Sequence, residues 1–178
     1  MFRLSDLLPY ENIVIQCHDH PDPDAVASAF GVYAYLTRQG KQAQIVYSGL
    51  EQIKKRNVSY MIEWLNIPIS HVRDPATVPR SELVVCVDCQ YGQGNITEME
   101  AETVAIIDHH LLVAREEDYN MGIIQPSLGS CATLVWDLLR KEGFDFGADK
   151  DIPASLYYGC LTDTNNFTEI SHPLDKDM

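Results

Sequence analysis

The chain has 178 residues, of which 46% are hydrophobic, and its formal net charge at pH 7 is -13. This length suits one compact domain with a buried core, so we expect a single domain over residues 1–178. The acidic excess argues against a broad basic surface for gripping nucleic acid, because such binding depends on Lys and Arg neutralising phosphates. The sequence contains no long apolar run and no secretion signal, and we therefore expect a cytoplasmic protein.

Short segments rich in Val and Ile alternate with segments of helical spacing. The predicted strands are residues 12–17, 43–47, 83–87 and 104–107, and their nearly continuous apolar character is typical of strands in a parallel sheet. The predicted helices are residues 24–39, 53–65, 131–141 and 152–162. This order predicts an α/β fold with a Rossmann-like, doubly wound, mainly parallel sheet flanked by helices. We expect no regular element over residues 171–178 and read the five cysteines as buried, reduced thiols.

The first polar cluster follows the first predicted strand and leads into the first helix, in the order His18-Asp-His-Pro21-Asp22-Pro23-Asp24. In a doubly wound sheet, ligands bind at the carboxyl ends of the strands. Two carboxylates and an imidazole at a turn stiffened by two prolines therefore suit a divalent cation. The alternative is structural: Asp24 caps the helix, Asp22 is a turn residue and His18 is a partly buried histidine.

Three further clusters end apolar segments. Asp88 directly follows the third predicted strand, Asp108-His109-His110 follows the fourth, and Asp163 ends the last helix. Each alone could be ordinary solvation where a strand leaves the core. Together the clusters crowd several acids into one place, which is costly without cations. Two divalent cations would remove this cost, because their four positive charges would balance the four aspartates outside the triplet. Adjacent side chains diverge on extended backbone, so we expect the two histidines to serve different atoms.

These motifs resemble those of the DHH phosphoesterase superfamily, which is named after the triplet found here at residues 108–110. The superfamily's opening motif is similar to residues 18–25, its strand-end aspartate to Asp88, and its closing Thr/Ser-Asp-Thr to residues 162–164. The superfamily includes RecJ-like exonucleases, nanoRNA and phosphoadenosine phosphatases, cyclic-dinucleotide phosphodiesterases, exopolyphosphatases and manganese pyrophosphatases. The resemblance implies a DHH catalytic domain.

The resemblance also implies a centre of two divalent cations, held by His18, Asp22, Asp24, Asp88, His109 and Asp163. Asp88 would bridge the two ions, His110 would be a catalytic residue facing the substrate, and Asp108 would orient the imidazoles. Oxygen and imidazole ligands favour Mn²⁺, with Mg²⁺ or Co²⁺ as alternatives. Ser130 could bind a substrate phosphate at a helix N-terminus, although simple capping of that helix explains it equally well.

The implied activity is that of a phosphoesterase in which a metal-activated water attacks phosphorus. We expect short oligonucleotides or nucleotide phosphates as substrates, with exopolyphosphatase or inorganic pyrophosphatase activity as the alternative. A C-terminal substrate-binding domain, common among such enzymes, is expected to be missing from this chain, and a homodimer is compatible with the resemblance. Two other classes are a non-catalytic nucleotide- or metal-binding regulatory module and a dehydrogenase, for which Gly92-Gln-Gly94 is the only hint.

Overall fold

A computed structural model of the chain describes residues 2–115 and 117–178. Its centre is a six-stranded sheet in the order β3-β2-β1-β4-β5-β6, in which every neighbouring pair is parallel. The strands are β1 (Asn12–Gln16), β2 (Gln42–Tyr47), β3 (Ile69–His71), β4 (Ser81–Val87), β5 (Ala101–Asp108) and β6 (Met121–Ile124). The predicted α/β class and parallel sheet are confirmed.

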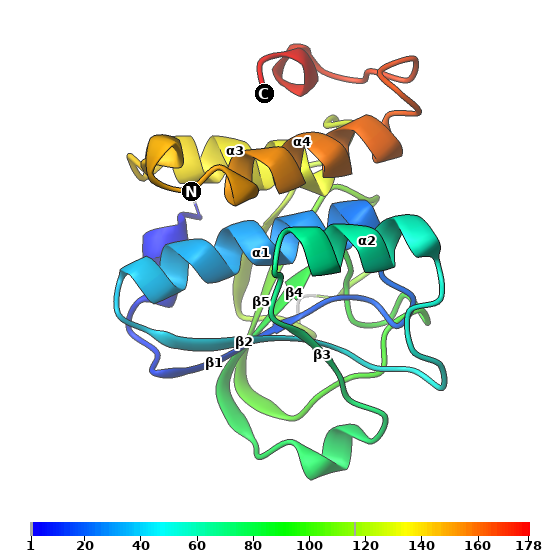
Figure 1. Ribbon diagram of the computed structural model, residues 1–178. Helices are drawn as coiled ribbons and strands as arrows, with labels where there is room; N and C mark the ends of the chain where they lie inside the picture. The colour runs from blue at the N-terminus through cyan, green and yellow to red at the C-terminus, as the bar shows by residue number, and fades with distance from the viewer. Residues whose placement is uncertain (1, 116) are drawn as a thin grey trace.

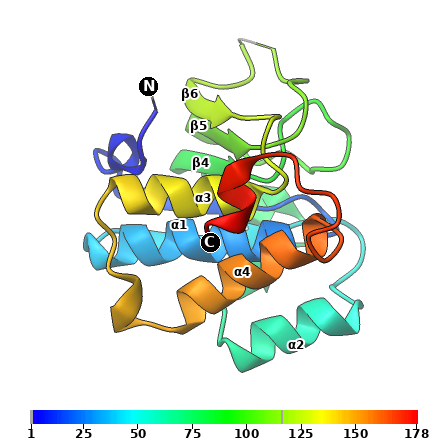
Figure 2. The ribbon, with the colours of Figure 1, turned by 90° about the horizontal axis from the view of Figure 1, so that it is seen from above.

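The four α-helices lie on one side of the sheet (Figure 1). They are α1 (Pro23–Arg38), α2 (Arg56–Trp64), α3 (Cys131–Lys141) and α4 (Asp151–Asp163). Seen from above, α3 and α4 lie over α1 (Figure 2), and α1 packs directly on the central strands. Gly159 allows α4 to approach closely, because a Cβ there would lie 3.0 Å from the Cβ of Ala27 on α1.

The two faces of the sheet are covered differently. Ile13 and Ile15 of β1 join the large core beneath the helices, whereas Val14 belongs to a smaller cluster on the opposite face. Coil residues such as Tyr91 and Met99, which connect β4 to β5, cover that second face. The sheet therefore has helices over one face and coil over the other in the described part of the chain.

Two strands were not predicted and one helix begins later than expected, while the other predicted elements are present with ends that differ by at most three residues. The strands β3 and β6 were not predicted, because they are only three and four residues long and half-buried, so they lack a continuous apolar run. The helix expected from residue 53 begins at Arg56, with Lys55 as its N-cap. The five cysteines are free and buried, as expected. Among the described residues, none of the helices has the length and apolar character that crossing a membrane requires.

The last residues form a short 3-10 helix, Pro173–Lys176, where we expected no element. Its Asp175 is buried, and the carboxylate accepts hydrogen bonds from the backbone N–H groups of Gly129 at 3.1 Å and His172 at 2.9 Å. The polar sequence gave no signal of this turn, because the turn is held by a buried acid rather than by apolar side chains. The C-terminal segment is thereby fixed beside the start of α3.

Candidate metal centre

The loop after β1 places two aspartates at the start of α1. Asp22 is the N-cap, and its Oδ1 accepts hydrogen bonds from the backbone N–H groups of Asp24 and Ala25, both at 3.0 Å. The capping residue is thus Asp22, whereas the structural alternative had assigned that role to Asp24. These capping bonds fix the direction of the Asp22 carboxylate. They use only one of its two oxygens, so the other oxygen is left for a ligand.

Asp24 connects the starts of α1 and α3. Its Oδ2 accepts from the N–H of Cys131 at 2.7 Å, and its Oδ1 accepts from the N–H of Ala132 at 2.8 Å. A helix N-terminus attracts anions, so α3 holds this carboxylate as it would hold a phosphate. Burial raises the pKa of Asp24 well above its usual range, and the nearby charges of Asp163 and Asp22 raise it further.

Asp88 lies at the centre of the cluster, directly after β4. Its φ of 60° is in the left-handed region, which is uncommon for residues other than glycine and is often found at functional sites. Its Oδ2 lies 3.9 Å from His18 Nε2, and its Oδ1 lies 3.5 Å from His109 Nε2. Burial raises the pKa of Asp88 well above its usual range, followed by the charges of Asp24 and Asp22.

His109 directs its Nε2 at the acids. Its Nδ1–H donates to the carbonyl oxygen of Leu128 at 3.2 Å, which holds the ring with Nε2 toward the carboxylates. That Nε2 lies 3.3 Å from Asp163 Oδ2, 3.5 Å from Asp88 Oδ1 and 3.8 Å from Asp24 Oδ2. An imidazole held in this way is arranged as a metal ligand.

The donor atoms fit divalent cations. In each of three groups the possible ligand atoms lie within 4.8 Å of one another, and the groups are His18–Asp22–Asp88, Asp24–His109–Asp163 and Asp88–His109–His110. Asp88 Oδ1 and His109 Nε2 are buried and have no hydrogen-bond partner among the described residues. Two buried polar atoms without partners are costly, and a cation bound between them would remove that cost. The structure therefore brings together all six expected ligands, and their binding of metal stays a prediction.

His110 lies beside His109 at the edge of the cluster, with its side chain half exposed. Its Nδ1–H donates to Asp108 Oδ1 at 2.9 Å, and this bond is the main reason that the pKa of His110 is raised. The two imidazoles do not diverge as adjacent residues of a strand would: their ring centroids are 4.4 Å apart and both face Asp88. The reason is that β5 ends at Asp108, so the backbone is no longer extended at the histidines. That they serve different atoms stays a prediction.

Gln90 is a buried residue of the site that we did not predict. Its Nε2–H groups donate to Asp108 Oδ2 at 2.6 Å and to the Leu111 carbonyl at 3.1 Å. Its Oε1 accepts from the N–H groups of Val113 at 2.8 Å and Ala114 at 3.1 Å. One carboxamide thus holds the loop that follows the histidines. The only signal in the sequence is a glutamine two residues beyond the strand-end aspartate.

Asp108 orients one imidazole rather than two. Burial acts to raise its pKa, but hydrogen bonds from His110 and Gln90 outweigh burial, so the pKa of Asp108 is lowered and the group is a carboxylate. Its Oδ1 also accepts from the backbone N–H of His109 at 2.8 Å. The ring of His109 is instead oriented by the Leu128 carbonyl, which corrects the expectation that Asp108 would position both rings.

Ser130 is a helix cap. Its Oγ accepts from the N–H of Thr133 at 3.0 Å, and the residue is completely buried. The next two amides, of Cys131 and Ala132, already donate to Asp24. The expectation that Ser130 could bind a substrate phosphate is therefore corrected: the helix N-terminus serves the chain's own carboxylate.

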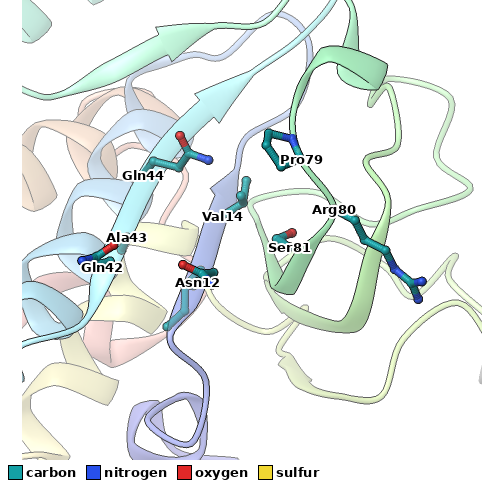
Figure 3. Close-up of a pocket in the computed structure, with 9 residues that line it drawn as sticks. Asn12, Val14, Gln42, Ala43, Gln44, Pro79, Arg80 and Ser81 are labelled. Carbon is teal, nitrogen blue, oxygen red and sulfur yellow. The ribbon is translucent and has the colours of Figure 1, made fainter.

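Other features of the chain do not compete with this centre. A hollow of about 450 Å³ lies at the opposite, amino end of the strands, between β1, β2 and the segment that leads into β4 (Figure 3). It is lined by carboxamides such as Gln42 and Gln44 and by Arg80, without the acid and imidazole pairs of the centre. Gly92 and Gly94 have positive φ angles in coil that leads to β5 rather than to a helix, so the dinucleotide-binding motif is absent there.

Comparisons with known proteins agree with the arrangement. The profile described as "DHH family, N-terminal domain" matches residues 12–161. Probable manganese-dependent inorganic pyrophosphatases are similar to this chain: the protein from Streptococcus thermophilus is 25% identical over 83% of this chain and 46% of its own length. The protein from Streptococcus mutans is 27% identical over 85% of this chain and 48% of its own.

The fold also occurs in a solved structure, an exopolyphosphatase-related protein from Bacteroides fragilis, with a TM-score of 0.71 and 23% identity. The alignment covers 93% of this chain and 51% of that one. The chain thus spans about half the length of the relatives that it matches.

Proposed function

Since this chain belongs to the DHH family, we propose that its metal centre hydrolyses a bond from phosphorus to oxygen in a phosphate-containing substrate. The observation that carries the proposal is the buried contact between Asp88 Oδ1 and His109 Nε2, 3.5 Å apart and both without hydrogen-bond partners in the described chain. A cation bound by both atoms would satisfy them. The names of the relatives support Mn²⁺ as that cation.

Pyrophosphate or inorganic polyphosphate is the substrate class that we propose. The similar proteins carry the names inorganic pyrophosphatase and exopolyphosphatase-related protein, which favours this alternative over the short oligonucleotides that we expected first. The expected second domain and the homodimer stay predictions.

The position of each ligand suggests which of the two cations it would hold. His18 and Asp22 would hold one cation, Asp24, His109 and Asp163 the other, and Asp88 both, since its two oxygens face different histidines. Two bound divalent cations would polarise the phosphoryl group and acidify water. The fixed carboxylates keep the ligand atoms in place before substrate arrives, so little reorganisation is required during the reaction.

His110 would act on the substrate. Asp108 accepts the Nδ1–H bond, which raises the pKa of the imidazole and leaves Nε2 at the half-exposed side of the ring. The protonated ring can then donate from Nε2 to a phosphoryl oxygen or to the leaving oxygen. Gln90 supports this role indirectly, because it holds the other oxygen of Asp108.

The proposal is tested by measuring metal content and phosphate release together. The purified chain is stripped with chelator, reloaded with Mn²⁺, and assayed with pyrophosphate, tripolyphosphate and a short oligonucleotide. We expect Mn²⁺ to bind and to restore release of orthophosphate from at least one inorganic substrate. Bound metal without turnover of any substrate would support the regulatory module instead. Full turnover after removal of all metal would contradict the proposal.

A further inference from the structure

We propose that the small pocket between residues 19–21 and residues 51–55 holds a second, non-reacting phosphate group of the substrate, with Lys55 as its main cationic contact. The inference rests on the proposed function, because it concerns the same substrate. It assigns a residue of this chain to the recognition of substrates that contain at least two linked phosphates.

The pocket adjoins the metal centre through a shared loop. Its walls include Asp19, His20 and Pro21, which lie between the expected metal ligands His18 and Asp22. The opposite wall is the segment before α2, residues 51–55. A group in this pocket would therefore be a neighbour of a group bound at the ions.

The size of the pocket suits a small polar group. Its volume is about 160 Å³, well below the roughly 300–1,000 Å³ of sites that enclose drug-sized ligands. A nucleoside would not fit inside it, whereas a tetrahedral phosphate offers few atoms and several acceptor oxygens. The volume thus favours an inorganic phosphate chain over a nucleotide base.

The walls of the pocket carry two carboxylates and two lysines, and Lys55 is the lysine without an ion pair among the described residues. Asp19 already accepts from the N–H of Thr97 at 2.9 Å and from its hydroxyl at 2.7 Å. Glu51 pairs with Lys54 at 2.9 Å. Lys55 forms no ion pair within the part of the chain that the structure describes, so its ammonium group is available to an anion. A phosphate there would gain a charge-assisted hydrogen bond.

Lys55 belongs to a short run of cations in an otherwise acidic chain. Elsewhere the chain repels polyanions, because its net charge is -13. Lys54, Lys55 and Arg56 form a run of three cations at this point, which would guide a chain of phosphates toward the ions.

The test compares Lys55→Gln with Lys150→Gln, a matched control. Each lysine is the N-cap of an α-helix and makes no side-chain capping bond, so each change removes one charge at an equivalent position. Metal content is measured first by elemental analysis. Binding of tripolyphosphate and of orthophosphate to the Mg²⁺-loaded chain is then measured by calorimetry.

We expect Lys55→Gln to weaken tripolyphosphate binding about tenfold, the effect of losing one charged hydrogen bond, and to leave orthophosphate binding and metal content unchanged. Lys150→Gln should change neither. Equal losses for the two variants, or an equal loss for orthophosphate, would overturn the inference, because the lysine would then act only by general charge or at the reacting phosphate. Failure of the unaltered chain to bind metal would instead contradict the proposed function.

Discussion

Two groups of acids and imidazoles lie side by side at the carboxyl end of the sheet, and they differ in how their polar atoms are satisfied. In the first, Asp88 and His109 face each other with buried atoms that have no hydrogen-bond partner in the described chain. In the second, Asp108 accepts hydrogen bonds on both oxygens, from His110 and Gln90. The pKa shifts of the two carboxyl groups are accordingly opposite: burial raises that of Asp88, while hydrogen bonds lower that of Asp108.

The polar atoms of the first group call for an external ligand, whereas those of the second group are satisfied within the chain. Buried carboxylates without donors are costly, and they are usually paired with a cation or a metal ion. A carboxylate whose oxygens are satisfied by the protein contributes to stability and fixes its neighbours. Substitutions in the two groups should therefore have different effects on metal binding and on folding.

The largest effect is expected for Asp88→Asn. Asparagine keeps the shape and tolerates the positive φ, but the charge that would serve both cations is lost. We expect the bound Mn²⁺ to fall by at least one ion per chain and phosphate release to drop to the level seen with chelator. Elemental analysis after dialysis against Mn²⁺ checks this result. Both ions still bound in the variant would show that Asp88 is not shared.

His110→Ala should come next, with a rate lowered by about 10²–10⁴ and with the metal retained. The imidazole is half exposed and bonded to Asp108, so its loss leaves the buried ligands in place. Single-turnover phosphate release and metal analysis on the same sample separate the two effects. His109→Ala is the control, for which we expect metal to be lost. If His110→Ala loses the metal instead, the roles of the two histidines are exchanged.

A smaller effect, measured as a loss of stability, is expected for Gln90→Met. Methionine fills a similar volume but leaves the Val113 and Ala114 amides and one oxygen of Asp108 without their partner. We expect unfolding by urea to show a loss of about 1–3 kcal/mol, the range for buried groups left unsatisfied. Gln93→Met on the same loop is a milder comparison, since Gln93 supplies only one bond, to the N–H of Gln90 at 3.0 Å. Equal stability of the two variants would contradict a special role for Gln90.

The sequence was sufficient to predict the sheet class and the residues that meet at its carboxyl end. Parallel strands buried on both faces leave long apolar runs, as in β4, and each run ends at a polar residue that the fold gathers at one edge. The edge strand β6 was missed because its four residues are all half-buried and one is Gly122, whose φ is 153°. A strand with so little buried surface has no pattern to detect.

Side-chain partners could not be predicted, because they join segments far apart in the chain. The carboxylate of Asp24 accepts hydrogen bonds from backbone N–H groups at the start of α3, more than a hundred residues later. That contact occupies the helix N-terminus at which Ser130 was expected to bind a phosphate. The carbonyl of Leu128, in coil, positions His109. Local sequence rules describe a helix cap, but they do not describe which distant group will occupy a helix N-terminus.

The smallest expected effect concerns the metal-free chain, where the two carboxyl groups should give opposite dependence on pH. The pKa of Asp88 is raised in the folded state, so between the unfolded value of about 3.9 and the raised value the folded chain holds more protons, and stability falls as pH rises. The pKa of Asp108 is lowered, so its contribution to stability is present above about pH 4 and is lost in acid.

In the metal-free chain at about pH 7, Asp88→Asn should therefore raise the free energy of unfolding by about 0.5–2 kcal/mol, a usual range for a stabilising change. Asp108→Asn should lower it, because it removes a carboxylate that accepts hydrogen bonds from Gln90 and His110. Urea unfolding in chelator at about pH 5 and pH 7 measures both variants, and the difference between them should grow with pH. With added Mn²⁺ the unaltered chain should become more stable than Asp88→Asn, because only the unaltered chain gains the full binding energy of the cations. Destabilisation by Asp88→Asn without metal would show that the carboxylate stabilises the fold by itself, and the contrast between the two groups would then fail.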